Sequence, residues 1–140
     1  IRLRSLMLRE DLPIYEKYIS GEFEPQSDDE VVEEIGKLVE KLTVHSNLKS
    51  DHIENLLEEV EGQLPQDKER ILQVIHRYLS LPDEERCIFT LGRRMGYYGR
   101  LDELSNPFKR EKIESILNEL RSKGEDLEKV LFYLKRRFLV

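Results

Sequence analysis

The sequence predicts an all-α fold, a single compact bundle of about six to seven helices. Apolar residues recur at spacings of three and four, which is the period of a helix with one buried face. No segment alternates polar and apolar residues like a half-buried strand, and no internal repeat of roughly 20–50 residues is visible. Linkers are short apart from residues 21–26, so residues 1–140 are expected to form one domain around one core.

Capping residues place the helices of the N-terminal half. A first helix is interrupted or restarted at Pro13. Ser27 is a predicted N-cap, followed by acidic residues that favour a helix start, and the apolar stripe after it ends near His45. Ser50 is the predicted cap of the next helix, which Gly62 ends. The inner face of that helix is expected to hold four apolar residues, Ile53, Leu56, Leu57 and Val60.

Proline and glycine mark the helices of the C-terminal half. Pro65 opens one helix and Pro82 opens the next. Residues 106–107, Asn-Pro, start a further helix, which Gly124 ends. The final helix is expected to run from Glu125 to the end of the chain. Its apolar stripe consists of Leu127, Val130, Leu131, Leu134 and Phe138.

The composition favours an intracellular protein. Charged residues make up 37% of the chain and apolar ones 39%, a balance typical of helices with solvated faces. Cys87 is the only cysteine, so no intrachain disulfide can form and nothing points to secretion. No apolar run approaches the roughly 18 residues of a membrane span, and we expect a cytoplasmic protein. The chain begins at Ile1, which suggests a fragment of something longer.

Charge is unevenly distributed along the chain. Residues 21–65 carry 13 acidic and 3 basic side chains, whereas residues 86–140 carry 13 basic and 8 acidic ones. This asymmetry predicts an acidic and a basic surface on one domain, unless both are only solvated helix faces. The acidic surface is the candidate for docking a basic protein partner by electrostatic complementarity. Its predicted protein-binding residues are Asp28, Asp29, Glu33 and Glu34.

Residues 92–100 interleave arginine and tyrosine among glycines, which is a chemistry suited to nucleic acid. Arginine binds phosphate in a bidentate way, tyrosine rings offer stacking faces, and glycine lets the backbone approach a partner closely. The alternative is an inter-helix turn whose tyrosines pack on the core and whose arginines are solvated. Together with basic residues further along, the predicted nucleic-acid-binding residues are Arg93, Arg94, Tyr97, Tyr98, Arg100, Lys109, Arg110 and Lys112.

A longer stretch, residues 81–123, resembles the DNA-binding region 4 of bacterial sigma factors. It opens with Leu-Pro-Asp-Glu-Glu-Arg, continues through a short helix with Leu101 and Leu104 inward, and ends in a basic-fronted helix. The resemblance implies a helix-turn-helix that presents its last helix to the major groove. The sequence departs from the family's pattern in having Gly92 inside the first helix, an extra Tyr-Tyr-Gly, and Pro107 in the turn.

Residues 70–78 resemble the Arg-x(4–6)-His motif of the helical HEPN ribonucleases. The resemblance implies that Arg70 would stabilise phosphate charge and that His76 would assist proton transfer at a 2′-hydroxyl. The sequence departs from the motif in two ways: no polar residue follows Arg70, and the intervening Ile-Leu-Gln-Val-Ile is a pattern typical of packing. His45 and His52 lack the spacing of a metal site, and no phosphate-cradling glycine loop is present.

These observations favour a non-catalytic interaction module within a larger assembly, concerned with nucleic-acid processing or transcription. Another protein is the expected partner. Direct DNA or RNA binding by the basic half is the first alternative, and a HEPN-like ribonuclease is the second. We expect no metal, no cofactor, no membrane contact and no small-molecule substrate.

Overall fold

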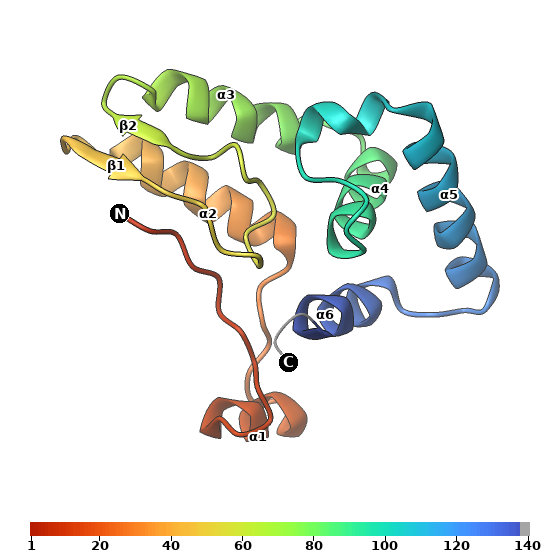
Figure 1. The fold of residues 1–140 in the computed structure, drawn as a ribbon. Helices are drawn as coiled ribbons and strands as arrows, with labels where there is room; N and C mark the ends of the chain where they lie inside the picture. Colours follow the sequence, from red (N-terminus) through yellow and green to blue (C-terminus); the bar gives the residue numbers. More distant parts are fainter. Residues whose placement is uncertain (138–140) are drawn as a thin grey trace.

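The computed structural model describes residues 1–137, and its fold is mostly helical (Figure 1). The helices are α1 (Pro13–Ser20), α2 (Asp28–Lys41), α3 (Lys68–Leu79), α4 (Asp83–Arg94), the 3-10 helix η1 (Leu101–Ser105), α5 (Pro107–Ser122) and α6 (Leu127–Arg137). The predicted continuation of the final helix through Phe138 lies outside the described residues. Two short strands, β1 (Ser46–Leu48) and β2 (Gly62–Leu64), form an antiparallel pair, so the expectation of a purely α fold was wrong in this detail.

Most helix boundaries follow the capping signals of the sequence. Ser27 caps α2: its side chain accepts from the Glu30 amide, while the Glu30 carboxylate accepts from the Ser27 amide. Asn106 caps α5 with its side-chain oxygen, and Pro107 follows at the first helical position. The predicted inward orientation of Leu101 and Leu104 in a short helix is confirmed, because both are buried on η1.

The largest difference between expectation and structure concerns residues 49–61, which form an irregular loop instead of the helix predicted after Ser50. Three of the four predicted inner residues are nevertheless buried, while Ile53 is exposed. In a helix, the carbonyl oxygens of this segment would accept hydrogen bonds from amides of the same helix. Here they accept hydrogen bonds from arginines on α4. Arg94 donates to the carbonyls of Ile53 and Glu54, and Arg93 donates to those of the next two residues. A long-range contact therefore replaces the helical hydrogen bonds of this segment.

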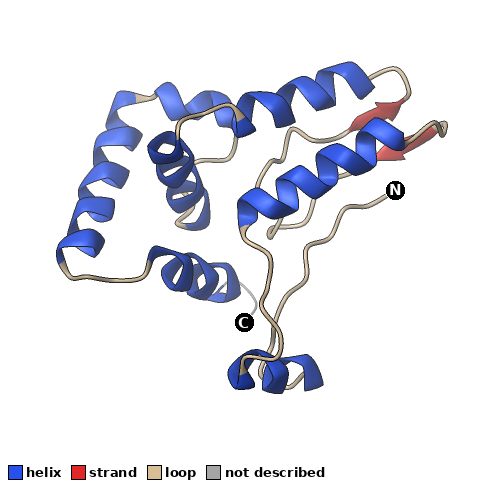
Figure 2. Cartoon of the chain, turned by 180° about the vertical axis from the view of Figure 1, so that it is seen from behind, coloured by secondary structure: helices blue, strands red, loops and turns tan. Residues whose placement is uncertain are grey.

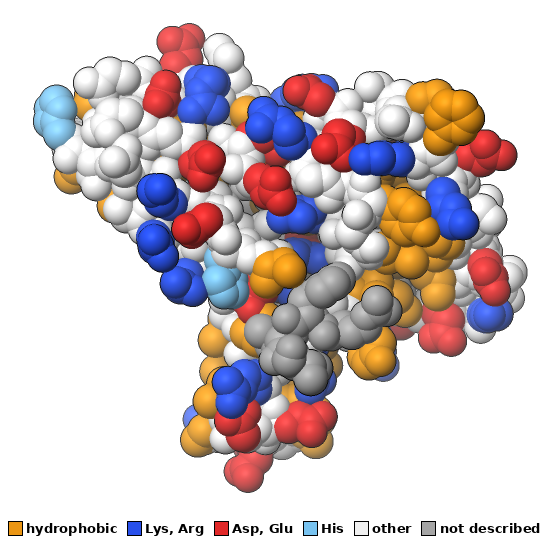
Figure 3. All heavy atoms as spheres, viewed as in Figure 1, with side chains coloured by type: hydrophobic (Ala, Val, Ile, Leu, Met, Phe, Trp, Pro, Cys, Tyr) orange, Lys and Arg blue, Asp and Glu red, His pale blue; other side chains and the backbone are white. Residues whose placement is uncertain are grey.

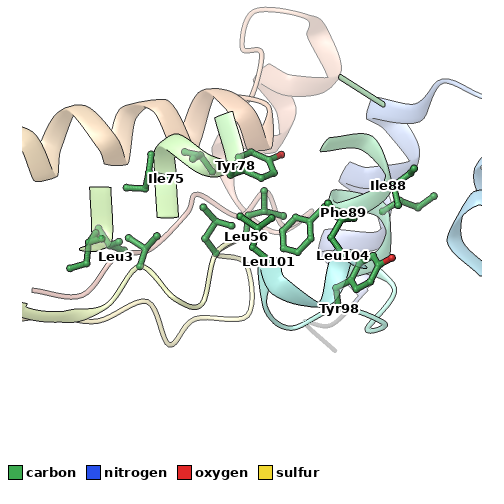
Figure 4. Close-up of a cluster of buried hydrophobic side chains, with 14 of the residues drawn as sticks. Leu3, Leu56, Ile75, Tyr78, Ile88, Phe89, Tyr98, Leu101 and Leu104 are labelled. Atoms are coloured by element: carbon green, nitrogen blue, oxygen red, sulfur yellow. The ribbon is translucent and has the colours of Figure 1, made fainter. Parts of the chain in front are cut away.

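Two groups of elements lie around the core. In Figure 1, α2 and α3 run side by side with the strands beside them, and α4, η1, α5 and α6 form the other group. The N-terminal segment lies along β1 and the residue after it: the Ile1 amino group donates to the Asn47 carbonyl, and the Leu3 amide donates to the Lys49 carbonyl. Aromatic side chains fill the centre (Figure 4). Phe89 lies between the rings of Tyr78 and Tyr98, with centroid separations of 5.9 and 5.8 Å.

Helix α1 lies apart from the other helices at one end of the molecule (Figure 2). None of its residues is buried. It contacts α6 through aromatic rings, where the ring centroids of Tyr18 and Phe132 are 5.0 Å apart. Within the described part of the chain, no helix has the length and apolar character needed to cross a membrane.

Candidate functional site

A buried ion cluster forms where α2, α4 and α6 meet the 49–61 loop. The guanidinium of Arg94 binds both carboxylate oxygens of Asp28, at 2.5 and 3.3 Å, and Lys135 Nζ reaches the same carboxylate at 3.3 Å. The side chains of Arg94 and Asp28 are only 3% and 11% exposed. Because these residues come from three helices, the cluster ties the two halves of the fold together.

Asp28 is held ionised by its neighbours. Burial opposes its ionisation, but Arg94 and then Lys135 outweigh that effect and hold the pKa of Asp28 below its ordinary value. The Asp28 carboxylate therefore stays negatively charged at neutral pH, with two cations against it.

Glu54 is the opposite case. Its side chain is only 1% exposed, and neither carboxylate oxygen has a hydrogen-bond partner within residues 1–137. Its ion-pair partner is His52, whose Nδ1 atom lies 3.9 Å from the Glu54 carboxylate. This distance is too long for a hydrogen bond. Burial raises the pKa of Glu54, and the positive charges of His52, Lys135 and Arg94 only partly oppose it.

Two hollows adjoin the ion cluster, and we call them together the acidic valley. The first, the α1–α6 groove, has a volume of about 400 Å³ and lies between α1, residues 24–30 and α6. The second, of about 320 Å³, lies between the N-terminal parts of α2, α4 and α6. The two hollows share three lining residues, Asp28, Glu128 and Leu131. The hollows are therefore adjacent, and they meet near the start of α6.

Carboxylates outnumber basic groups in the acidic valley. The basic groups are Arg86, Lys129 and Lys135. The carboxylates are Glu24, Asp28, Asp29, Glu30, Asp83, Asp126 and Glu128. Burial, followed by repulsion from Asp28 and Asp29, raises the pKa of Glu128. The smaller, repulsive part of this shift shows that Asp28 and Asp29 lie close enough to Glu128 for their charges to be felt.

Asp29 is fixed by contacts to the core. Tyr78 donates its hydroxyl hydrogen to Asp29 Oδ1 at 2.5 Å and lies 3.0 Å from the Thr90 hydroxyl. Arg86 Nε lies 3.4 Å from the other oxygen of Asp29. Burial, together with the hydrogen bond to Asp29, raises the pKa of Tyr78, so this hydroxyl stays protonated.

The four predicted protein-binding residues divide into two pairs. Asp28 and Asp29 line the acidic valley, although both are engaged by internal partners. Glu33 and Glu34 lie on the exposed face of α2, outside both hollows. The structure therefore brings only half of the predicted set to one place.

The predicted nucleic-acid-binding residues do not form one exposed patch, which corrects the expectation for several of them. Tyr98 and Arg94 are buried. Arg93 is nearly buried, where it pairs with Glu58 and supports the 49–61 loop. Lys109 and Arg110 are half-buried in ion pairs with Glu103 and Glu85. The ring of Tyr97 is partly buried, and only Arg100 and Lys112 of the predicted set are exposed.

The glycine and tyrosine of this segment have a packing role. A Cβ atom added to Gly92 would lie 2.3 Å from the Tyr98 ring, so only glycine lets that ring rest against the backbone of α4. The amides of Tyr97 and Tyr98 both donate to the Gly92 carbonyl and close the end of the helix. For Tyr98, the alternative of an inter-helix turn packed on the core is what the structure shows.

Arg70 and His76, the pair of the HEPN-like motif, have separate surroundings. Arg70 donates to the carbonyls of Glu59 and Glu61, whereas His76 lies 3.6 Å from the Glu40 carboxylate on α2. Within residues 1–137, no group of three His, Cys, Asp or Glu side chains is arranged to hold a metal ion. Burial raises the pKa of the half-buried Cys87 thiol, which does not favour a nucleophile.

Sequence reasoning missed the residues that complete the acidic valley. Leu6, Tyr18 and Phe132 come from opposite ends of the chain, and no local pattern links them. Asp126 and Glu128 were missed because a basic stretch follows them. Their usable signal was an acidic residue just before a helix and another in its first turn.

Comparisons of the chain with protein-family models, with characterised proteins and with solved structures found no match.

Proposed function

We propose that this domain is a non-catalytic interaction module that binds a basic segment of another protein in the acidic valley. The observation that carries the proposal is the excess of carboxylates around the two adjoining hollows. Arg86, Arg94 and Lys135 engage Asp28, Asp29 and Asp83 from within. The valley holds four further carboxylates, Glu24, Glu30, Asp126 and Glu128. Two of them, Glu30 and Asp126, keep their charge but also accept hydrogen bonds from amides at the starts of α2 and α6.

Electrostatic complementarity of this kind acts on the rate of association as well as on affinity. Clustered charge of one sign attracts an oppositely charged partner over about one Debye length, roughly 8–10 Å at physiological salt. Binding should therefore weaken steeply as salt is added.

A fluorescein-labelled, lysine-rich helical peptide tests the proposal by fluorescence anisotropy at low salt. The double variant Glu24→Lys/Glu128→Lys should weaken binding by at least roughly tenfold, because it places two cations on the rim. The matched control is Glu33→Lys/Glu111→Lys, which makes the same charge change at two exposed positions outside both hollows and should weaken binding far less. Equal losses in the two double variants would mean that only net charge matters.

Direct nucleic-acid binding remains the alternative proposal. Its support is the exposure of Arg100 and Lys112, while the other predicted residues are engaged in packing or ion pairs. A mobility shift of duplex DNA and of structured RNA at low salt tests it, and the Arg100→Ala/Lys112→Ala variant should abolish any shift.

A further inference from the structure

The α1–α6 groove has an apolar side as well as a charged rim. Tyr18 and Phe132 pack ring against ring, and Leu6 and Pro25 lie beside them along the same groove. Leu6 is 57% exposed in spite of its apolar side chain. Apolar surface lining a groove costs free energy while it faces water, and a bound apolar group would recover that cost.

A cation from α6 packs against aromatic rings at this groove. Arg136 lies over the rings of Tyr15 and Phe132, at 5.1 and 5.8 Å from their centroids. The same guanidinium pairs with Glu10 at 3.2 Å. The aromatic side of the groove is thus preorganised without burial of any α1 residue.

Cations on the groove do not cancel its negative rim. Lys135 is paired with Asp28. Lys129 lines the groove together with three carboxylates, Asp126, Glu128 and Glu30. An occupant must therefore combine an apolar side chain with positive charge. An anionic lipid surface or a phosphate would meet repulsion from the same carboxylates.

We propose that the α1–α6 groove binds an amphipathic helix of the partner, with one apolar anchor residue against Leu6, Tyr18 and Phe132 and with Lys or Arg on either side of it. This inference rests on the proposed function and specifies the chemistry of the partner. A helix laid in a groove presents apolar residues at spacings of three and four, with its charges on the flanks. The volume of about 400 Å³ is sufficient for one large apolar side chain and the stems of the flanking cations.

Two probe peptides separate the anchor from the charge. One is a helical peptide with lysine on the flanks and leucine on one face. The other has the same lysines with glutamine in place of leucine. Anisotropy with the wild-type domain should show at least fivefold tighter binding of the leucine peptide.

Matched variants of the protein make the test specific. Leu6→Ser should remove most of the preference for the leucine peptide, because it deletes an exposed groove residue without touching the core. Ile19→Ser is the control: Ile19 is 66% exposed on α1 but lies outside the groove, so the preference should remain. Circular dichroism establishes that both variants are folded.

The outcomes distinguish the two proposals. If both peptides bind equally to all proteins, basic binding stands and the anchor is refuted. If neither peptide binds at low salt, both proposals fail. If sedimentation shows a dimer that Leu6→Ser dissociates, or if anionic vesicles bind in place of the peptides, the groove has a different occupant and the inference is overturned.

Discussion

The basic segment, residues 93–112, and the acidic valley use their charges in opposite ways. In the basic segment, most cations are matched by carboxylates or carbonyls from other parts of the fold, as Arg94 is by Asp28 and Arg110 is by Glu85. In the acidic valley, carboxylates gather with fewer cations. Acidic and basic side chains are intermingled over much of the face in Figure 3. A run of charge along a sequence therefore does not identify a charged surface until its partners are known.

Removing a matched cation from the basic segment should have the largest effect. Arg94→Met leaves the buried Asp28 carboxylate without its main partner and should lower the free energy of unfolding by about 3–5 kcal/mol. Arg100→Met, at an exposed position in the same segment, should change it by no more than about 0.5 kcal/mol. Urea unfolding at neutral pH measures both.

The pH dependence of the same pair has a defined sign. The folded pKa of Asp28 lies below its ordinary value, so its stabilising contribution is present above the unfolded pKa and is lost as pH falls through the folded one. Arg94→Met should flatten this acid limb. An unchanged acid limb, or similar losses from Arg94→Met and Arg100→Met, would contradict the structural role of Arg94.

A smaller effect is expected from the glycine that accommodates Tyr98. Gly92→Ala should cost about 1–3 kcal/mol by overpacking, because the new Cβ would enter the ring's position. Adding Tyr98→Leu should restore part of the loss, since the smaller side chain can yield. Thermal unfolding of the single and double variants measures the coupling, and additive effects would show that the ring does not contact Gly92.

The smallest of these effects concerns the buried acid without a partner. The folded pKa of Glu54 is raised, so its contribution is present at low pH and is lost as pH rises through that folded pKa. Glu54→Gln should remove this alkaline loss and gain about 1–2 kcal/mol on the alkaline side. Glu61→Gln, at an exposed position in the same loop, should keep the wild-type profile in urea unfolding. Parallel profiles for all three proteins would place the Glu54 carboxylate in contact with water.

The sequence predicted local structure well where capping residues decide it. The start of α2 follows from Ser27 and its reciprocal bond with Glu30, and the start of α5 follows from Asn106 and Pro107. These contacts join residues within one turn of each other, so a single sequence contains the necessary information.

Prediction failed where distant residues decide the backbone. Leu56, Leu57 and Val60 have helical spacing and are buried, yet the carbonyls of their loop are bound by arginines from α4. The same long-range contacts removed Arg93 and Arg94 from the predicted nucleic-acid surface. At the candidate site, Asp28 and Asp29 were predicted. The apolar side of the α1–α6 groove was not, because Leu6 and Phe132 are separated by almost the whole chain.

The contact between Tyr18 and Phe132 has a consequence for biosynthesis. Ribosomes add roughly 5–20 residues per second, so α1 emerges on the order of ten seconds before the helix on which it packs. During that interval its aromatic rings and Leu6 have no neighbour from the C-terminal end. The first helix should therefore stay accessible to chaperones until α6 has left the exit tunnel.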